Sequence, residues 1–137
     1  VWLTPPAMLQ ALGPFDLDPC AATGRPWPTA EVHFTEADDG LSQPWHGFVW
    51  CNPPYGNLGP WVRAFKTWAW AGAIVVALLP NATDTRWFRE AARTATEIRL
   101  MEGRVQFVGT TSSNPSGSIV AIWTPYMPPS GAHICTW

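Results

Sequence analysis

Residues 47–60 read Gly-Phe-Val-Trp-Cys-Asn-Pro-Pro-Tyr-Gly-Asn-Leu-Gly-Pro, and this stretch decides how the rest of the chain is interpreted. The apolar run 48–51 predicts a short buried strand, because aromatic and β-branched side chains fit a covered sheet. Pro53 and Pro54 end that strand, since neither has an N–H for the sheet ladder and a proline disfavours helical backbone before it. The chain therefore leaves the sheet at Asn52 in a rigid, extended turn.

This turn offers two hydrogen-bond acceptors and a flat ring. The acceptors are the side-chain carbonyl of Asn52 and the main-chain carbonyl of Pro53, and the ring is that of Tyr55. Together they suit a planar exocyclic amine, such as that of an adenine turned out of a duplex, with its nitrogen lone pair directed at an electrophile. The alternative is a turn that simply ends a strand, with a stacked proline and tyrosine.

The chain resembles the phage-type DNA N6-adenine methyltransferase (Dam-like) family over nearly its whole length. The similar segments follow in family order: Trp2 with Thr4-Pro5, 15–21 (FDLDPCA), 38–41 (DDGL), 52–55 (NPPY), 78–80 (LLP) with 83–88 (TDTRWF), and 103–107 (GRVQF). The resemblance implies an enzyme that transfers a methyl group from S-adenosylmethionine to the N6 amine of adenine in DNA. It implies catalytic roles for Asn52, Pro53, Pro54 and Tyr55.

Two other functions stay open on the residues alone. The same turn could hold another amine, in an RNA base or a protein glutamine, or the chain could bind cofactor or DNA without catalysis. The resemblance also implies a phage- or prophage-encoded protein that acts in the bacterial cytoplasm. A homodimer is compatible with the sequence.

Three segments are expected to contact S-adenosylmethionine. Thr4 precedes a helical segment predicted over 5–13, with Pro5 in its first turn, and is also a natural N-cap for it. A strand predicted over 15–18 ends in an acid and a small-residue loop, which would present a carboxylate and backbone amides at the sheet edge. Its expected contacts are Asp18, Pro19, Cys20 and Ala21. The third pair is Asp38 and Asp39, for which an Asx-type turn is the structural alternative. Glu31 and Glu36 are both candidates to bind the cofactor ribose.

Composition limits the function classes. The 137 residues, 47% of them hydrophobic, predict one folded domain over 1–137 that is too small to include a separate target-recognition domain. The resemblance implies that it is a minimal methyltransferase domain. The longest apolar run, around 69–80, is too short to cross a bilayer. Three widely spaced cysteines form neither a metal pattern nor a disulfide framework, so no metal is expected and the thiols are taken as reduced.

Positive charge is concentrated although the net charge is −2. Seven of the eight basic residues lie between 63 and 104. Within a helix predicted from Thr83 or Asp84 to about 95, three arginines share a face and are expected to bind DNA: Arg86, Arg89 and Arg93. An ordinary solvated helix face is the alternative. With no recognition domain, target selection would come from loops such as 24–35, 81–85 and 110–118 or from a second subunit, or the specificity would be low.

Helix and strand patterns alternate along the rest of the chain. A helix is predicted over 58–70, a buried strand over 73–79, and short strands over 98–100, 104–107 and 119–124, whereas 125–137 is expected to be irregular. This pattern predicts an α/β fold with a single, mostly parallel sheet, helices on both faces and a truncated first half. The resemblance implies the Rossmann-like class I methyltransferase form, with an antiparallel final hairpin.

Overall fold

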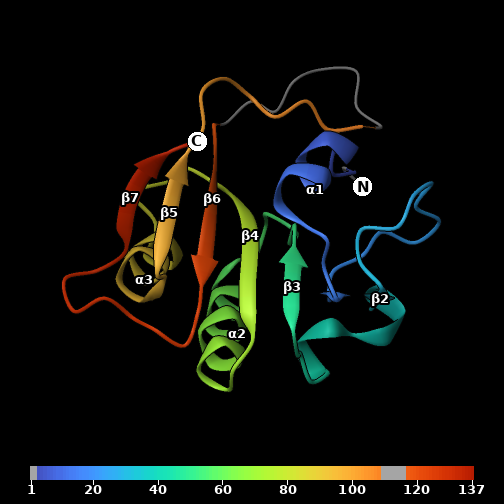
Figure 1. The fold of residues 1–137 in the computed structure, drawn as a ribbon, viewed down its shortest axis with the longest axis horizontal. Helices are drawn as coiled ribbons and strands as arrows, with labels where there is room; N and C mark the ends of the chain where they lie inside the picture. The colour runs from blue at the N-terminus through green and yellow to red at the C-terminus, as the bar shows by residue number, and fades with distance from the viewer. Residues whose placement is uncertain (1–2, 109–116) are drawn as a thin grey trace.

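The computed structural model describes residues 3–108 and 117–137, which form one seven-stranded sheet with helices on both faces (Figure 1). The strand order is β2-β1-β3-β4-β6-β5-β7. The strands are β1 (Leu17–Asp18), β2 (Val32–His33), β3 (Phe48–Cys51), β4 (Ile74–Pro80), β5 (Glu97–Leu100), β6 (Ser118–Trp123) and β7 (His133–Thr136). The helices are α1 (Pro6–Leu12), α2 (Gly59–Trp70) and α3 (Arg86–Thr94), with 3-10 turns η1 (Glu36–Asp38) and η2 (Gly40–Ser42).

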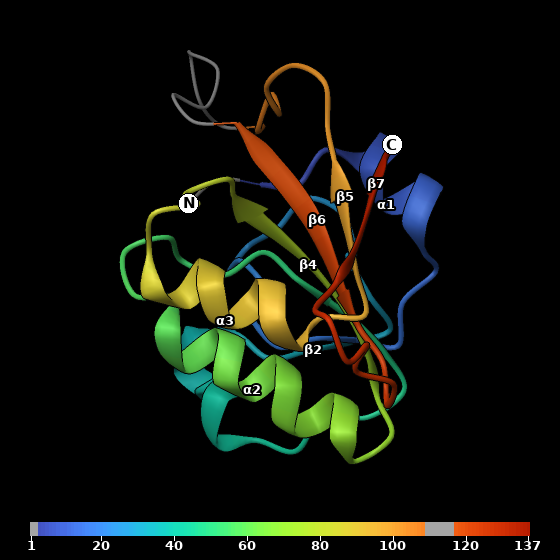
Figure 2. The same cartoon turned by 90° about the vertical axis from the view of Figure 1, so that its left-hand side faces the viewer.

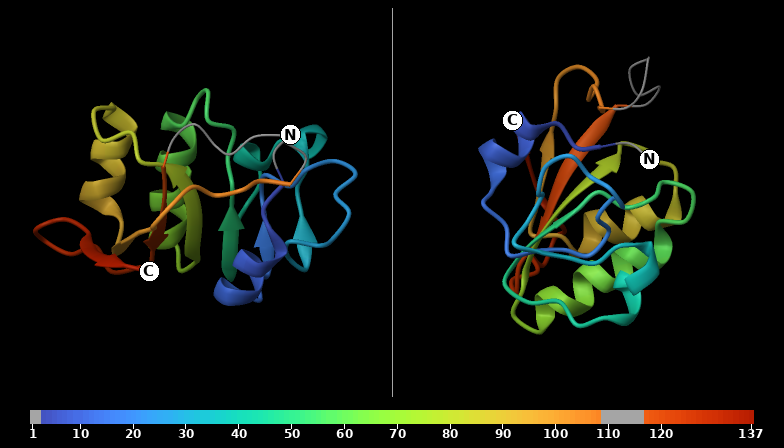
Figure 3. Two further views of the ribbon diagram at one scale, coloured as in Figure 1. Left: turned by 90° about the horizontal axis from the view of Figure 1, so that it is seen from above. Right: turned by 90° about the vertical axis from the view of Figure 1, so that its right-hand side faces the viewer.

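The sheet is mixed. The pairs β2–β1, β1–β3, β3–β4 and β5–β7 are parallel, whereas β6 runs antiparallel to both of its neighbours, β4 and β5. The single sheet and the antiparallel final hairpin predicted from the sequence are confirmed. The parallel arrangement holds across β2, β1, β3 and β4 and is broken by β6. Seen from above, β2 and β7 lie at opposite ends of the sheet (Figure 3).

Side chains of the central strands alternate between two core layers, as the period of a strand requires. One layer lies under α2 and α3 and contains Val49, Cys51, Val75, Ala77 and Leu79. The other lies under α1 and contains Trp50, Val76, Leu78 and Val120. Figure 2 shows α2 and α3 on one side of the sheet and α1 on the other. The buried run of β4 is apolar on both faces for this reason.

The first half of the sheet is truncated, as expected. No helix connects β1 to β2, and the intervening loop is held by a side chain instead. The Nε2 atom of His33 accepts hydrogen bonds from the backbone N–H groups of Thr29 and Ala30, at 3.1 and 3.2 Å. A two-residue strand is therefore sufficient to extend the sheet beyond β1.

Both predicted helix caps were wrong. Helix α1 begins at Pro6 with Pro5 as its N-cap residue, and no side chain caps it. Helix α3 is capped by Thr85, whose hydroxyl accepts from the N–H of Phe88 at 3.2 Å. Thr4 is used elsewhere, because it is buried and its hydroxyl oxygen lies 3.5 Å from the side-chain nitrogen of Asn52, in the turn that follows β3.

Two predictions for the C-terminal part were also wrong. Residues 104–107 form no strand, although Val105 and Phe107 are buried in the α1 layer. The tail is not wholly irregular, because β7 pairs with β5, and its ends are fixed by hydrogen bonds from His133 N–H to Thr96 O and from Trp137 N–H to Leu100 O. Trp2 and most of loop 110–118 lie outside the described residues.

Candidate active site

The candidate catalytic residues lie where β1 and β3 end side by side. These two strands are parallel, with Leu17 opposite Val49, so Asp18 and the turn after Cys51 lie at the same edge of the sheet. From β1 the chain moves to β2 on one side and then crosses to β3 on the other. Ligands of open α/β sheets bind at such a switch point, outside the carboxyl ends of the strands.

Asn52 is oriented by a residue from the start of the chain. Its Nδ2 atom lies 3.5 Å from the Oγ1 atom of Thr4, at the outer limit of a hydrogen bond, and Thr4 is buried. With the amide nitrogen directed at Thr4, the carbonyl oxygen of Asn52 is the atom left to accept a hydrogen bond from a substrate. This is the acceptor that the sequence predicted for the turn.

Tyr55 is anchored to the neighbouring strands by its hydroxyl. The hydroxyl donates to the carbonyl oxygen of Leu78 at 3.5 Å and makes a side-chain hydrogen bond with Ser118. Burial raises the pKa of the phenol well above its usual value, and the bond to Ser118 opposes this only in part. The ring is therefore neutral near pH 7 and half-buried, and it borders the core under α2. Pro53 is buried and Pro54 is exposed.

Asp18 is a buried acid held by its own loop. Its carboxylate accepts hydrogen bonds from the N–H of Cys20 at 3.0 Å and from the hydroxyl of Thr29. Desolvation by burial nevertheless raises its pKa from 3.8 to about 6, although these bonds and the charge of Arg25 lower it. A cationic group beside Asp18 would stabilise the charged form, so the site suits a positively charged ligand.

The turn 38–40 packs against the loop that follows Asp18. A Cβ atom at Gly40 would lie 1.8 Å from the carbonyl oxygen of Pro19, so only glycine allows this contact. Asp38 accepts hydrogen bonds from the backbone N–H and hydroxyl of Thr35, at 2.9 and 3.2 Å, which is the structural use of an acid in a turn. Asp39 is exposed and has a left-handed backbone with φ 53°.

The two thiols near the site are unsuited to act as nucleophiles at neutral pH. Burial raises the pKa of Cys51 well above its usual value. The pKa of Cys20 is raised to about 12, first by burial and then by the negative charges of Asp18 and Glu36. A thiolate is the reactive form of cysteine, and neither residue supplies one.

The three arginines of α3 are exposed, but they lie at different distances from the catalytic edge. Arg86 begins the helix, directly after the turn that follows β4, whereas Arg93 lies about 10 Å further along at 1.5 Å per residue. In the described part of the chain none of the three is in an ion pair, while Lys66 of α2 pairs with Glu90 at 3.0 Å. Arg86 is thus the member of the predicted set that the fold brings closest to the sheet edge that carries the candidate catalytic residues.

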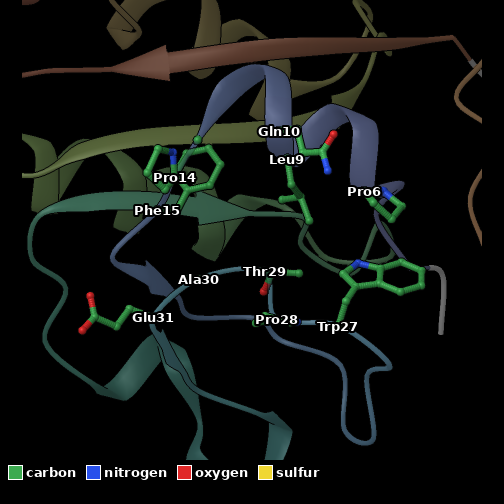
Figure 4. A pocket seen from close by; sticks show the side chains of 11 residues that line it. Pro6, Leu9, Gln10, Pro14, Phe15, Trp27, Pro28, Thr29, Ala30 and Glu31 are labelled. Atoms are coloured by element: carbon green, nitrogen blue, oxygen red, sulfur yellow. The ribbon is translucent and has the colours of Figure 1, made fainter.

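A hollow of about 590 Å³ runs along α1, between this helix and residues 27–31 (Figure 4). Its lining includes Thr29, the partner of Asp18, but neither Asp18 nor Asn52. It is therefore adjacent to the candidate catalytic residues and separated from them by Thr29.

Sequence reasoning missed Thr29, Gly40 and Ser118. Thr29 lies 11 residues after Asp18 in an irregular loop, and no local pattern marks it as a partner. Ser118 starts the last predicted strand and Gly40 stands in a plain turn motif, so their contacts depend on distant segments of the chain. A glycine directly after two acids was the one signal that could have been followed.

A protein-family model described as DNA N-6-adenine-methyltransferase (Dam) matches residues 1–136. The chain belongs to this family. A relative, the DNA N-6-adenine-methyltransferase of Haemophilus phage HP1 (strain HP1c1), is 32% identical over 123 residues, which cover 83% of this chain and 69% of the relative. No solved structure matches the chain significantly.

Membership of the Dam family confirms the resemblance seen in the sequence and the enzyme class, an adenine-specific DNA methyltransferase. The class implies a methyl donor of the S-adenosylmethionine type and fits a DNA substrate. Over residues 3–108 and 117–137 the structure contains no cluster of three or more His, Cys, Asp or Glu side chains suited to a metal ion. None of the helices in these two ranges combines the length and apolar character needed to cross a bilayer.

Proposed function

We propose that this Dam-family chain transfers the methyl group of S-adenosylmethionine directly to the N6 amine of an adenine that has been flipped out of DNA. The observation that carries this proposal is the position of the turn 52–55, beside the buried Asp18 at the switch point of the sheet. The curated phage relative is named for the same reaction. Because this relative comes from a phage, we infer that the enzyme acts in the bacterial host cell.

The residues around Asp18 fit such a methyl donor. The donor carries an ammonium and a sulfonium charge, and a buried carboxyl whose pKa is raised by desolvation is stabilised in its charged form by a cation. Asp18 and the backbone of 19–21 would hold the methionine half. Thr4, Pro5, Asp38 and Asp39 complete the proposed set; both aspartates are exposed, and the carboxylate of Asp38 caps its own turn.

The turn then performs the chemistry by positioning. The side-chain carbonyl of Asn52 and the main-chain carbonyl of Pro53 accept hydrogen bonds from the two N–H groups of the adenine amine. Tyr55 stacks on the base, and Pro54 keeps the turn extended. When bound, S-adenosylmethionine supplies an electrophilic methyl group. The amine proton is lost to solvent after the nitrogen becomes cationic, so no general base is needed, in keeping with a neutral Tyr55.

The strand order supports the Rossmann-like class I form of the fold. The chain places β2, β1, β3 and β4 in parallel and inserts the reversed β6 between β4 and β5, which is the antiparallel final hairpin that the family resemblance implies. Arg86, Arg89 and Arg93 are proposed to bind DNA phosphates, Arg86 most closely to the target base.

The experiment is methylation of unmodified double-stranded DNA with methyl-labelled S-adenosylmethionine, followed by nuclease digestion and mass spectrometry of the nucleosides. Labelled N6-methyladenine is expected from the wild-type protein and not from Asn52→Ala. The proposal would be contradicted if no labelled N6-methyladenine formed in DNA while parallel incubations with RNA or protein gave label in an RNA base or in a protein glutamine.

A further inference from the structure

Trp27 separates two hollows at the surface. The larger hollow, of about 590 Å³, is lined by residues of α1 and by 27–31, and the second, of about 360 Å³, by residues 24–28. Trp27 and Pro28 belong to both linings. Prolines on both sides of Trp27 restrict the backbone of this segment, so little backbone freedom is left to lose when a ligand binds there.

The Trp27 end of the larger hollow lies toward the catalytic edge. Figure 4 shows the indole near Pro6, with Glu31 at the far end. Pro6 comes two residues after Thr4, which contacts Asn52, and Thr29, two residues after Trp27, donates to Asp18. Both segments that hold the Trp27 end are therefore tied directly to proposed catalytic or cofactor-binding side chains.

The charge around Trp27 favours a nucleotide. Arg25 lines the second hollow, and one of its N–H groups donates to the carbonyl of Ala22 at 3.2 Å. A guanidinium has five N–H donors, so a phosphate can be bound beside that contact. The larger hollow also carries the amide of Gln10, which can hydrogen-bond a base edge.

We propose that Trp27 stacks on a base next to the target adenine and that Arg25 pairs with the adjoining phosphate. The inference rests on the proposed function and extends its DNA site to a flanking nucleotide. Nucleobases stack on aromatic side chains without requiring a particular sequence, so this contact holds the opened strand in place. It gives the truncated first half of the fold a role in DNA binding.

The test is DNA binding by fluorescence anisotropy, which needs no turnover. One labelled duplex contains a single adenine opposite an abasic position, and a second has abasic positions on both sides of that adenine as well. Trp27→Ala is expected to weaken binding of the first duplex about 5- to 100-fold and to leave binding of the second nearly unchanged. Trp27→Phe should retain most of the affinity for the first. Equal affinity for the second duplex also shows that Trp27→Ala is folded.

The matched control is Trp70→Ala, which removes an equally large ring that is 65% exposed at the far end of α2. It should bind both duplexes as the wild-type protein does. The proposal is overturned if the wild-type protein shows no preference for the first duplex, or if Trp27→Ala binds both duplexes like wild type. If Trp27→Ala increased the dissociation constant of S-adenosylmethionine and left DNA binding unchanged, the hollow would be assigned to the methyl donor instead. A wild-type protein that binds DNA through Trp27 without forming N6-methyladenine would contradict the proposed function and leave this contact standing.

Discussion

The side-chain nitrogen of Asn52 lies 3.5 Å from the hydroxyl oxygen of Thr4, which joins two segments separated by 48 residues. This contact directs the amide nitrogen of Asn52 at Thr4 and leaves its carbonyl oxygen as the acceptor for the proposed substrate. Thr4→Val should therefore lower kcat about 2- to 10-fold, the range expected for one neutral hydrogen bond, and Thr4→Ser should restore it. Steady-state kinetics on DNA measure this. A loss as large in Thr4→Ser would exclude the hydroxyl as the cause.

Asn52 and Asp18 are expected to fail in different ways. Asn52→Ala removes an acceptor for the reacting amine, so turnover should fall at least about 100-fold while the dissociation constant of S-adenosylmethionine stays within about threefold. Asp18→Ala should chiefly weaken donor binding. Calorimetric titration with single-turnover kinetics separates the two effects. Similar losses of donor affinity in both variants would contradict this division of roles.

The buried Asp18 predicts an unusual dependence of stability on pH. Because its folded-state pKa of about 6 lies above 3.8, its contribution to stability is complete below pH 3.8 and is lost as the pH rises toward 6. The difference between the folded and the unfolded pKa of Asp18 corresponds to about 3 kcal/mol in the free energy of unfolding. In urea titrations, the free energy of unfolding of Asp18→Asn should not fall between pH 3.8 and 6. In a separate titration with S-adenosylmethionine, the affinity of the wild-type protein for the donor should increase as the pH rises through 6. A pH-independent donor affinity would contradict the charged contact.

His33 predicts a contribution to stability that is lost as the pH falls, opposite in direction to that of Asp18. Burial, assisted by the charge of Arg25, lowers the pKa of His33, and the neutral ring is the form that accepts from Thr29 and Ala30. Its contribution to stability is present above pH 6.5 and is lost as the pH falls through the lowered value. Urea titrations in an Asp18→Asn background, which removes the competing trend, should show a smaller decrease on acidification in His33→Gln. An equal decrease would place the titrating group elsewhere.

Position along α3 predicts unequal effects of its arginines on DNA binding. If Arg86 contacts one phosphate, Arg86→Ala should weaken DNA binding and reduce by about 0.9 the slope of the logarithm of the binding constant against the logarithm of the salt concentration. Arg93→Ala should change both quantities less, since Arg93 lies further from the candidate catalytic residues. Lys66→Ala is the control, because Lys66 pairs with Glu90. Binding isotherms at several salt concentrations measure this, and equal slopes for all three variants would contradict it.

The sequence alone predicted the elements that have strong local patterns. The apolar run of β4 and the helical spacing of α2 gave these elements to within about two residues, and the two prolines after Asn52 gave the end of β3. The acid at the end of β1 was predicted at Asp18, and the turn with its acceptors at 52–55. These signals are local, because periodicity and missing N–H groups act within a few residues.

Tertiary structure decided what those residues contact. Thr4 was predicted to cap a helix and instead contacts Asn52, while a tail expected to be irregular forms β7 beside β5. Asp18 depends on Thr29, and the turn at Gly40 depends on the backbone of Pro19. Each of these contacts forms when distant segments meet at one edge of the sheet, and hydrogen-bond partners at that distance leave no period in the sequence. The chain therefore encodes its catalytic turn locally, and packing determines the surroundings in which that turn works.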